Sequence, residues 1–73
     1  MSLPIIKHNR THQFASGLLQ RYGMHVEKHA TRNEYYVMRD EHLIVIYNTL
    51  PTLFAFVRGV YATHREYISD ILE

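Results

Sequence analysis

The chain lacks the residues with which many small domains are stapled together. Its 73 residues include no cysteine and no tryptophan, and only 3 glycines and 2 prolines. The absence of cysteine excludes disulfides, thiol chemistry and cysteine-ligated zinc. A chain of this length hides only about 60 % of the surface that its unfolded form exposes. We therefore expect one domain, residues 1–73, that gains stability from a partner.

Long apolar runs are also absent. No stretch approaches the roughly 20 apolar residues that a membrane-spanning helix needs. The segment Leu3–Ile6 is too short for the core of a signal peptide. Because 47 % of the residues are nevertheless hydrophobic, the composition favours a folded domain. We expect a cytoplasmic protein with no membrane association.

Charge is unevenly distributed along the chain. The formal net charge is only +1, but residues 1–36 carry five basic and two acidic side chains, whereas residues 37–73 carry three basic and five acidic ones. Such an asymmetry can steer a charged partner, or it can be an ordinary solvated surface.

The first third of the chain predicts an arm and a helix. We expect residues 1–10 to form an arm that is flexible or pairs as an edge strand, because Pro4 cannot donate a ladder hydrogen bond. Apolar residues then recur at helical spacing, which predicts a helix from Thr11 to Tyr22. Asn9 and Thr11 are candidate N-caps, and Gly23 is a typical residue to follow a helix end.

Three segments of strand character follow the helix. They are Met24–His29, Tyr35–Arg39 and His42–Asn48, separated by short polar turns. The third is the most apolar run of the chain, with alternating faces of Leu43, Val45, Tyr47 and of Ile44, Ile46. Short turns predict an antiparallel meander in which His42–Asn48 is the last strand.

A helical pattern begins after Asn48. Thr49 suits an N-cap and Pro51 suits the first turn. The pattern predicts one long helix, or two shorter helices that break near Ala62. The expected fold is therefore α+β, with a three-stranded antiparallel sheet, an N-terminal helix and one long or two short C-terminal helices, in the order α-β-β-β-α(α).

Protein–protein association is the function that the sequence favours. A strand that is apolar on both sides leaves a surface for a partner if the helices cover only one face of the sheet. We expect a small non-enzymatic regulatory or adaptor module, a homodimer in the simplest case. The expected partner-binding residues are Ile44, Ile46, Tyr47 and Phe56. Alternatively, helices cover both faces and the strand is only core.

Nucleic-acid binding is the first alternative. Aromatic side chains on a sheet with flanking arginines can stack on single-stranded bases and neutralise phosphates. The residues that could form such a surface are Lys7, Arg10, Lys28, Arg32, Tyr35, Tyr36 and Arg39. Only one of the adjacent tyrosines can face outward, because neighbours on a strand point in opposite directions.

Metal binding is the second alternative, and catalysis is not expected. His8 and His12 are four residues apart and would share a face if a helix included both. There is no nucleophile elbow and no glycine-rich phosphate loop. We expect no enzyme activity, no cofactor and no small-molecule substrate.

No motif is specific enough to name a family. The hairpin that leads into Asn48–Leu50 and an apolar helix resembles a pattern common in very small bacterial and phage proteins. This resemblance covers about a third of the chain and implies no functional residues.

Overall fold

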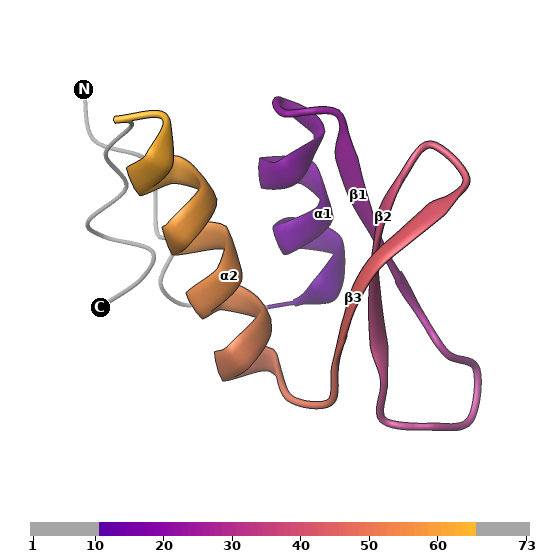
Figure 1. The fold of residues 1–73 in the computed structure, drawn as a ribbon. Helices are drawn as coiled ribbons and strands as arrows, with labels where there is room; N and C mark the ends of the chain where they lie inside the picture. Colours follow the sequence, from indigo (N-terminus) through magenta and orange to yellow (C-terminus); the bar gives the residue numbers. More distant parts are fainter. Residues whose placement is uncertain (1–10, 66–73) are drawn as a thin grey trace.

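The computed structural model describes residues 11–65, which form one helix, a three-stranded sheet and a second helix (Figure 1). In chain order the elements are α1 (His12–Gln20), β1 (Met24–Lys28), β2 (Tyr35–Arg39), β3 (His42–Tyr47) and α2 (Leu50–Thr63). The order α-β-β-β-α confirms the expected α+β fold and the antiparallel meander. The predicted arm, residues 1–10, lies outside the described residues.

Both helices begin at a threonine that serves as an N-cap. The Oγ1 atom of Thr11 accepts a hydrogen bond from the Phe14 amide, at 3.1 Å. Thr49 accepts from the Thr52 amide in the same way at the start of α2, where Pro51 lies in the first turn. These hydroxyls satisfy amides that have no partner within the helix, which fixes where each helix starts.

Each helix ends where the chain turns with a left-handed backbone conformation. Gly23 follows α1 with a φ of 78°, a value that glycine adopts without steric cost. After α2, Arg65 has a φ of 60°. The helix therefore ends at Thr63, close to the break expected near Ala62. The second C-terminal helix that the sequence allowed falls on residues 66–73, outside the described part.

The sheet has the order β1-β2-β3, so that β1 and β3 are its two edges. The register between β2 and β3 shifts once: Val37 pairs with Val45, but Met38 pairs with Leu43. This bulge leaves Ile44 as an extra residue. The predicted alternation of faces along β3 is therefore wrong at its beginning, because a bulge reverses the sides of the residues that precede it.

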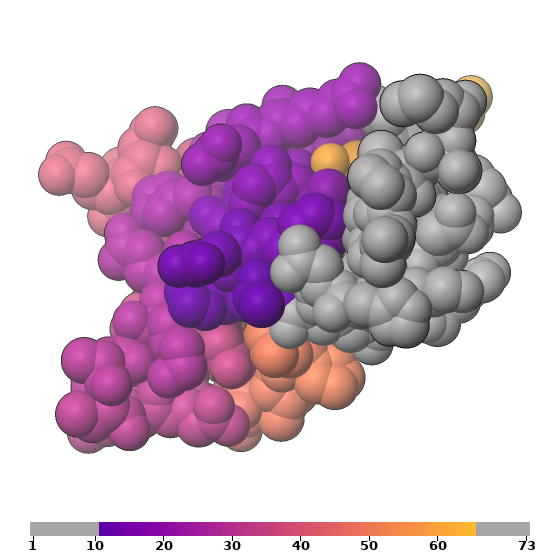
Figure 2. All heavy atoms as spheres, turned by 180° about the vertical axis from the view of Figure 1, so that it is seen from behind, coloured from indigo at the N-terminus to yellow at the C-terminus, as the bar shows by residue number. Residues whose placement is uncertain are grey.

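The core lies between the two helices and one face of the sheet. Figure 1 shows α1 and α2 on the same side of the strands, and the view from behind shows α1 across the middle of the molecule (Figure 2). The buried hydrophobic residues are Ala15, Leu19, Met24, Val26, Tyr35, Val37, Leu53, Phe54, Val57 and Tyr61. The opposite face of the sheet is not covered by any described helix or loop.

Two side-chain hydrogen bonds join elements that are distant in the sequence. The Tyr61 hydroxyl donates to the carbonyl oxygen of Leu18 at 2.8 Å, which ties α2 to α1. The Val26 amide donates to Ser16 Oγ at 2.9 Å, which ties the outer side of β1 to α1. The first of these bonds fixes the helix pair, and the second occupies an amide on one edge of the sheet.

Candidate protein-binding surfaces

Strand β3 carries the exposed large hydrophobic residues of the described part of the chain. Leu43 is 52 % exposed, Ile44 45 % and Ile46 47 %. The strand that the sequence marks as the most apolar is thus the least buried of the three. Buried strands normally carry such residues, so their exposure on β3 marks a candidate interaction site.

The residues of β3 are divided between two surfaces. Ile46 pairs with Tyr36 and Leu43 pairs with Met38, which places these four side chains on the face of the sheet that lies opposite the helices. We call this surface the open face. Ile44, displaced by the bulge, instead lines a groove on the helix side. One strand therefore contributes apolar side chains to both sides of the sheet edge.

The two edges of the sheet differ in how well they are protected from pairing with a further strand. Helix α1 packs directly against β1, and its Ser16 accepts the hydrogen bond of the Val26 amide. By contrast, β3 makes few contacts with α2. Natural proteins protect edge strands with charged residues or proline, and the segment Leu43–Tyr47 contains neither. Judged from residues 11–65, β3 is the edge that is open to pairing with another strand.

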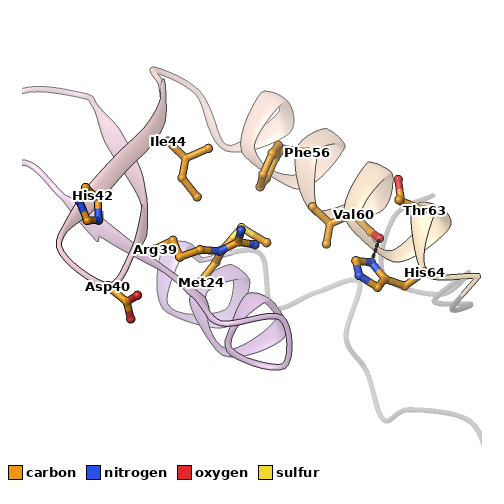
Figure 3. Close-up of a pocket in the computed structure, with 9 residues that line it drawn as sticks. All are labelled: Met24, Arg39, Asp40, His42, Ile44, Phe56, Val60, Thr63 and His64. Carbon is orange, nitrogen blue, oxygen red and sulfur yellow. Dashed lines mark hydrogen bonds between the residues drawn. The ribbon is translucent and has the colours of Figure 1, made fainter.

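The groove on the helix side lies between β3 and α2 and has a volume of about 520 Å³ (Figure 3). Its apolar walls are formed by Met24, Ile44, Phe56 and Val60. Polar residues line the remainder: Arg39, Asp40, His42, Thr63 and His64. A volume of this order is within the range of sites that bind small molecules or single side chains.

Arg39 occupies the middle of this groove. Figure 3 shows its side chain running along the groove beside Met24, between Ile44 and Val60. Its Nη2 atom donates one long hydrogen bond, of 3.4 Å, to the carbonyl oxygen of Tyr22. Among residues 11–65, no carboxylate lies within 4.0 Å of the guanidinium. Asp40, its neighbour in the sequence, points away from it (Figure 3).

His64 is held at the end of the groove formed by α2. Its Nδ1 atom donates to the carbonyl oxygen of Val60 at 2.9 Å (Figure 3). Its ring also packs against the ring of Tyr22, with the centroids 4.1 Å apart. His42 lies at the opposite end, beside the β2–β3 turn (Figure 3). The groove thus has a histidine at each end and an arginine between them.

The four predicted partner-binding residues are not one surface. Ile46 lies on the open face, whereas Ile44 and Phe56 line the groove. Tyr47 is half-buried and does not line the groove, although its ring centroid lies 5.8 Å from that of Phe56, which does. Sequence reasoning missed the role of Arg39 in the groove, because its proximity to α2 depends on how the helix packs.

The tyrosines that were expected to bind nucleic acid lie on opposite faces of β2. Tyr35 is 7 % exposed and faces the core. Tyr36 lies on the open face and donates a hydrogen bond to Glu34 Oε1 at 2.8 Å. This bond to the carboxylate, together with some burial and the negative charge of Glu34, raises the pKa of Tyr36. The outward tyrosine is therefore adjacent to an acidic group.

The basic residues of the same set are dispersed. The ammonium group of Lys28 lies 5.8 Å from the ring centre of Tyr35 and donates to the carbonyl oxygens of His29 and Arg32. Arg32 pairs with Glu34 at 3.9 Å, and Arg39 lies in the groove on the other side of the sheet. Lys7 and Arg10 lie outside the described residues. Of the described cations in this set, Arg32 is near enough to Tyr36 to oppose the rise of its pKa, whereas Lys28 and Arg39 are engaged elsewhere.

The described residues form no cluster of ligands that would support the metal-binding alternative. His12 lies on α1 with its ring 6.0 Å from that of Tyr35, and His8 lies outside the described residues. Within residues 11–65, no group of three or more histidine, aspartate or glutamate side chains could hold a metal ion. In the same part of the chain, no helix is long and apolar enough to span a membrane.

Comparisons with protein-family models, with curated proteins and with solved structures find no match to this chain.

Proposed function

We propose that this chain is a small, non-enzymatic protein-binding module that associates through β3 and forms a homodimer. The observation that carries the proposal is the combination of an open sheet edge with the exposed side chains of Leu43 and Ile46. Two copies of β3 can pair antiparallel about a two-fold axis, because the same strand supplies both halves of the interface. The role that fits such a module is regulation or assembly of protein complexes.

The expected strength of the dimer follows from the exposed area. Burying a Leu or Ile side chain completely stabilises by about 1.5–3 kcal/mol, so a half-exposed one contributes about half of that on association. In an edge-to-edge pair these side chains contact only their cross-strand neighbours, so Leu43 and Ile46 from two subunits contribute at most roughly 3–6 kcal/mol. Association costs about 4–15 kcal/mol, and each strand hydrogen bond returns only about 0.5–1.5 kcal/mol net. These terms nearly cancel, so we expect a weak dimer that forms only at high protein concentration, not one of nanomolar affinity.

Nucleic-acid binding is less well supported by the same geometry. A stacking surface needs outward aromatic rings with cations beside them. The outward ring of Tyr36 is bonded to Glu34, and Arg39 lies on the other side of the sheet. The apolar residues of β3, by contrast, have no described partner element over them.

Sedimentation equilibrium of the whole chain tests the proposal. At concentrations up to about 0.5 mM, a mass approaching twice that of the 8.7 kDa chain supports the dimer. The variant Ile46→Lys places a charge on the exposed edge strand and should sediment as a monomer. The matched control Ala55→Lys adds the same charge at an exposed position of α2 and should leave the dimer intact.

Two results would overturn the dimer. One is a wild-type chain that remains monomeric over the whole concentration range. The other is an equal loss of dimer in both lysine variants, which would assign the effect to added charge instead of to β3. Circular dichroism of each variant verifies that the fold is retained, as expected because Ile46 is 47 % exposed.

A further inference from the structure

We propose that the groove between β3 and α2 binds the C-terminus of a partner polypeptide, with its last, apolar side chain in the groove and its free carboxylate on Arg39. This inference deepens the protein-binding role and rests on it. It uses residues on the helix side of the sheet, however, and these are separate from the open-face residues Leu43 and Ile46 assigned to the dimer.

The apolar part of the ligand follows from the walls of the groove. Ile44, Phe56 and Val60 surround it, and Met24 closes its base (Figure 3). Ile44 is 45 % exposed, and Phe56 and Val60 are half-buried. An aliphatic side chain placed here would remove apolar surface of both molecules from water, which is the main favourable term in such binding.

The anionic part follows from Arg39. A guanidinium has five N–H donors in a fixed fork that matches a carboxylate. In the described structure only one long bond, to the carbonyl oxygen of Tyr22, engages this group. No carboxylate of residues 11–65 comes within 4.0 Å, so the groove offers a cation without a described counter-ion. Charge complementarity with Arg39 therefore favours an anion on the ligand.

Because Arg39 lies between apolar walls, the C-terminus of a peptide fits the groove better than an internal acidic residue does. In an extended peptide, adjacent side chains point to opposite faces, so an aspartate next to an inward apolar residue would point away from the groove. The next inward side chain lies two residues further on, about 6.6 Å along the strand. A C-terminal residue instead carries its side chain and its carboxylate on the same Cα atom, and both reach the groove together.

Fluorescence polarisation with labelled peptides tests this site. The probe is a short glycine–serine peptide that ends in leucine with a free carboxylate. Two matched peptides carry a C-terminal amide or a final serine instead. We expect the free acid ending in leucine to bind, and each of the other two to bind about ten-fold more weakly or worse, since a charge-assisted bond or an aliphatic side chain contributes at least that factor.

Variants assign the effect to the groove. In Arg39→Gln the acid and the amide should bind equally weakly, because the fork that distinguishes them is gone. The control Arg32→Gln removes another exposed arginine, located in the β1–β2 loop, and should leave the preference for the acid unchanged. Equal binding of acid and amide by the wild type, no effect of Arg39→Gln, or no binding of the free acid would each overturn the proposal.

The same measurements separate this site from the dimer. Ile46→Lys should abolish the dimer and retain the affinity for the peptide, whereas Arg39→Gln should retain the dimer. A dimer with no peptide binding removes the C-terminus site alone. Peptide binding by a monomeric wild type removes the dimer alone.

Discussion

The hydrogen bond between Tyr61 and Leu18 should make a measurable contribution to the stability of the helix pair. Tyr61 is 7 % exposed, and its hydroxyl donates at 2.8 Å to a carbonyl in the last turn of α1. Carbonyls of a last turn lack partners further along the helix, so Tyr61→Phe would leave this one without its donor. The free energy of unfolding should fall by about 1–3 kcal/mol. For a chain of this size, each kcal/mol corresponds to about 4–8 °C in Tm.

The matched control is Tyr36→Phe, which also removes one hydroxyl with a 2.8 Å hydrogen bond. Its partner Glu34 lies on the exposed side of the sheet, where water can replace the lost donor, so Tm should change little. Both variants are measured by thermal unfolding at one protein concentration, because a dimer makes Tm depend on concentration. Equal losses in the two variants, or no loss in Tyr61→Phe, would refute the assignment of a structural role to the Tyr61–Leu18 bond.

Two further predictions concern titration and backbone conformation. The hydrogen bond to Glu34, assisted by burial and by the carboxylate charge, raises the pKa of Tyr36 above its ordinary value of 10.0. The stability that this hydrogen bond contributes is fully present below about pH 10 and is lost as the pH rises through the pKa of Tyr36 in the folded state. A ¹³C NMR titration of the tyrosine rings should show a lower pKa for Tyr36 in Glu34→Gln. An unchanged pKa would contradict the assignment of the shift to Glu34. Gly59 lies exposed in α2, where a Cβ atom would meet no side chain within 4 Å, so Gly59→Ala should stabilise by about 0.5–1 kcal/mol in urea unfolding. Gly23 has a φ of 78°, so Gly23→Ala should destabilise the fold by about 1–2 kcal/mol. If Gly23→Ala and Gly59→Ala changed the free energy of unfolding in the same direction, backbone conformation would not explain the two effects.

Local sequence signals predict most of the fold. The cap at Thr11, the cap at Thr49 and Gly23 act within a few residues of where they occur, so they determine helix ends without help from distant parts of the chain. The strands are recognisable from their β-branched and aromatic composition, and β2 has the predicted limits of Tyr35 and Arg39. Whether the helices cover one face of the sheet or two is not decided by these signals, because it depends on how the elements pack.

The candidate sites are less predictable than the fold. The sequence predicts that β3 is a strand for association, but the bulge at Ile44 depends on its register with β2. Regular alternation therefore assigns Leu43 and Ile44 to the wrong faces. Arg39 gives no signal for the groove, since its contact with Tyr22 and its place beside α2 join residues far apart in the chain.

The hydrogen bond from the Val26 amide to Ser16 has a consequence for assembly size. A sheet with two open edges can add copies at both, and repeated addition gives a growing fibril. Here α1 packs against β1 and Ser16 accepts the hydrogen bond of the Val26 amide, so within residues 11–65 β3 is the edge that remains open. In the proposed dimer, pairing through β3 would use that edge in both partners, so growth would end at two chains. The packing of α1 against β1, of which the Ser16 bond is a part, would therefore limit the proposed assembly to a pair of chains.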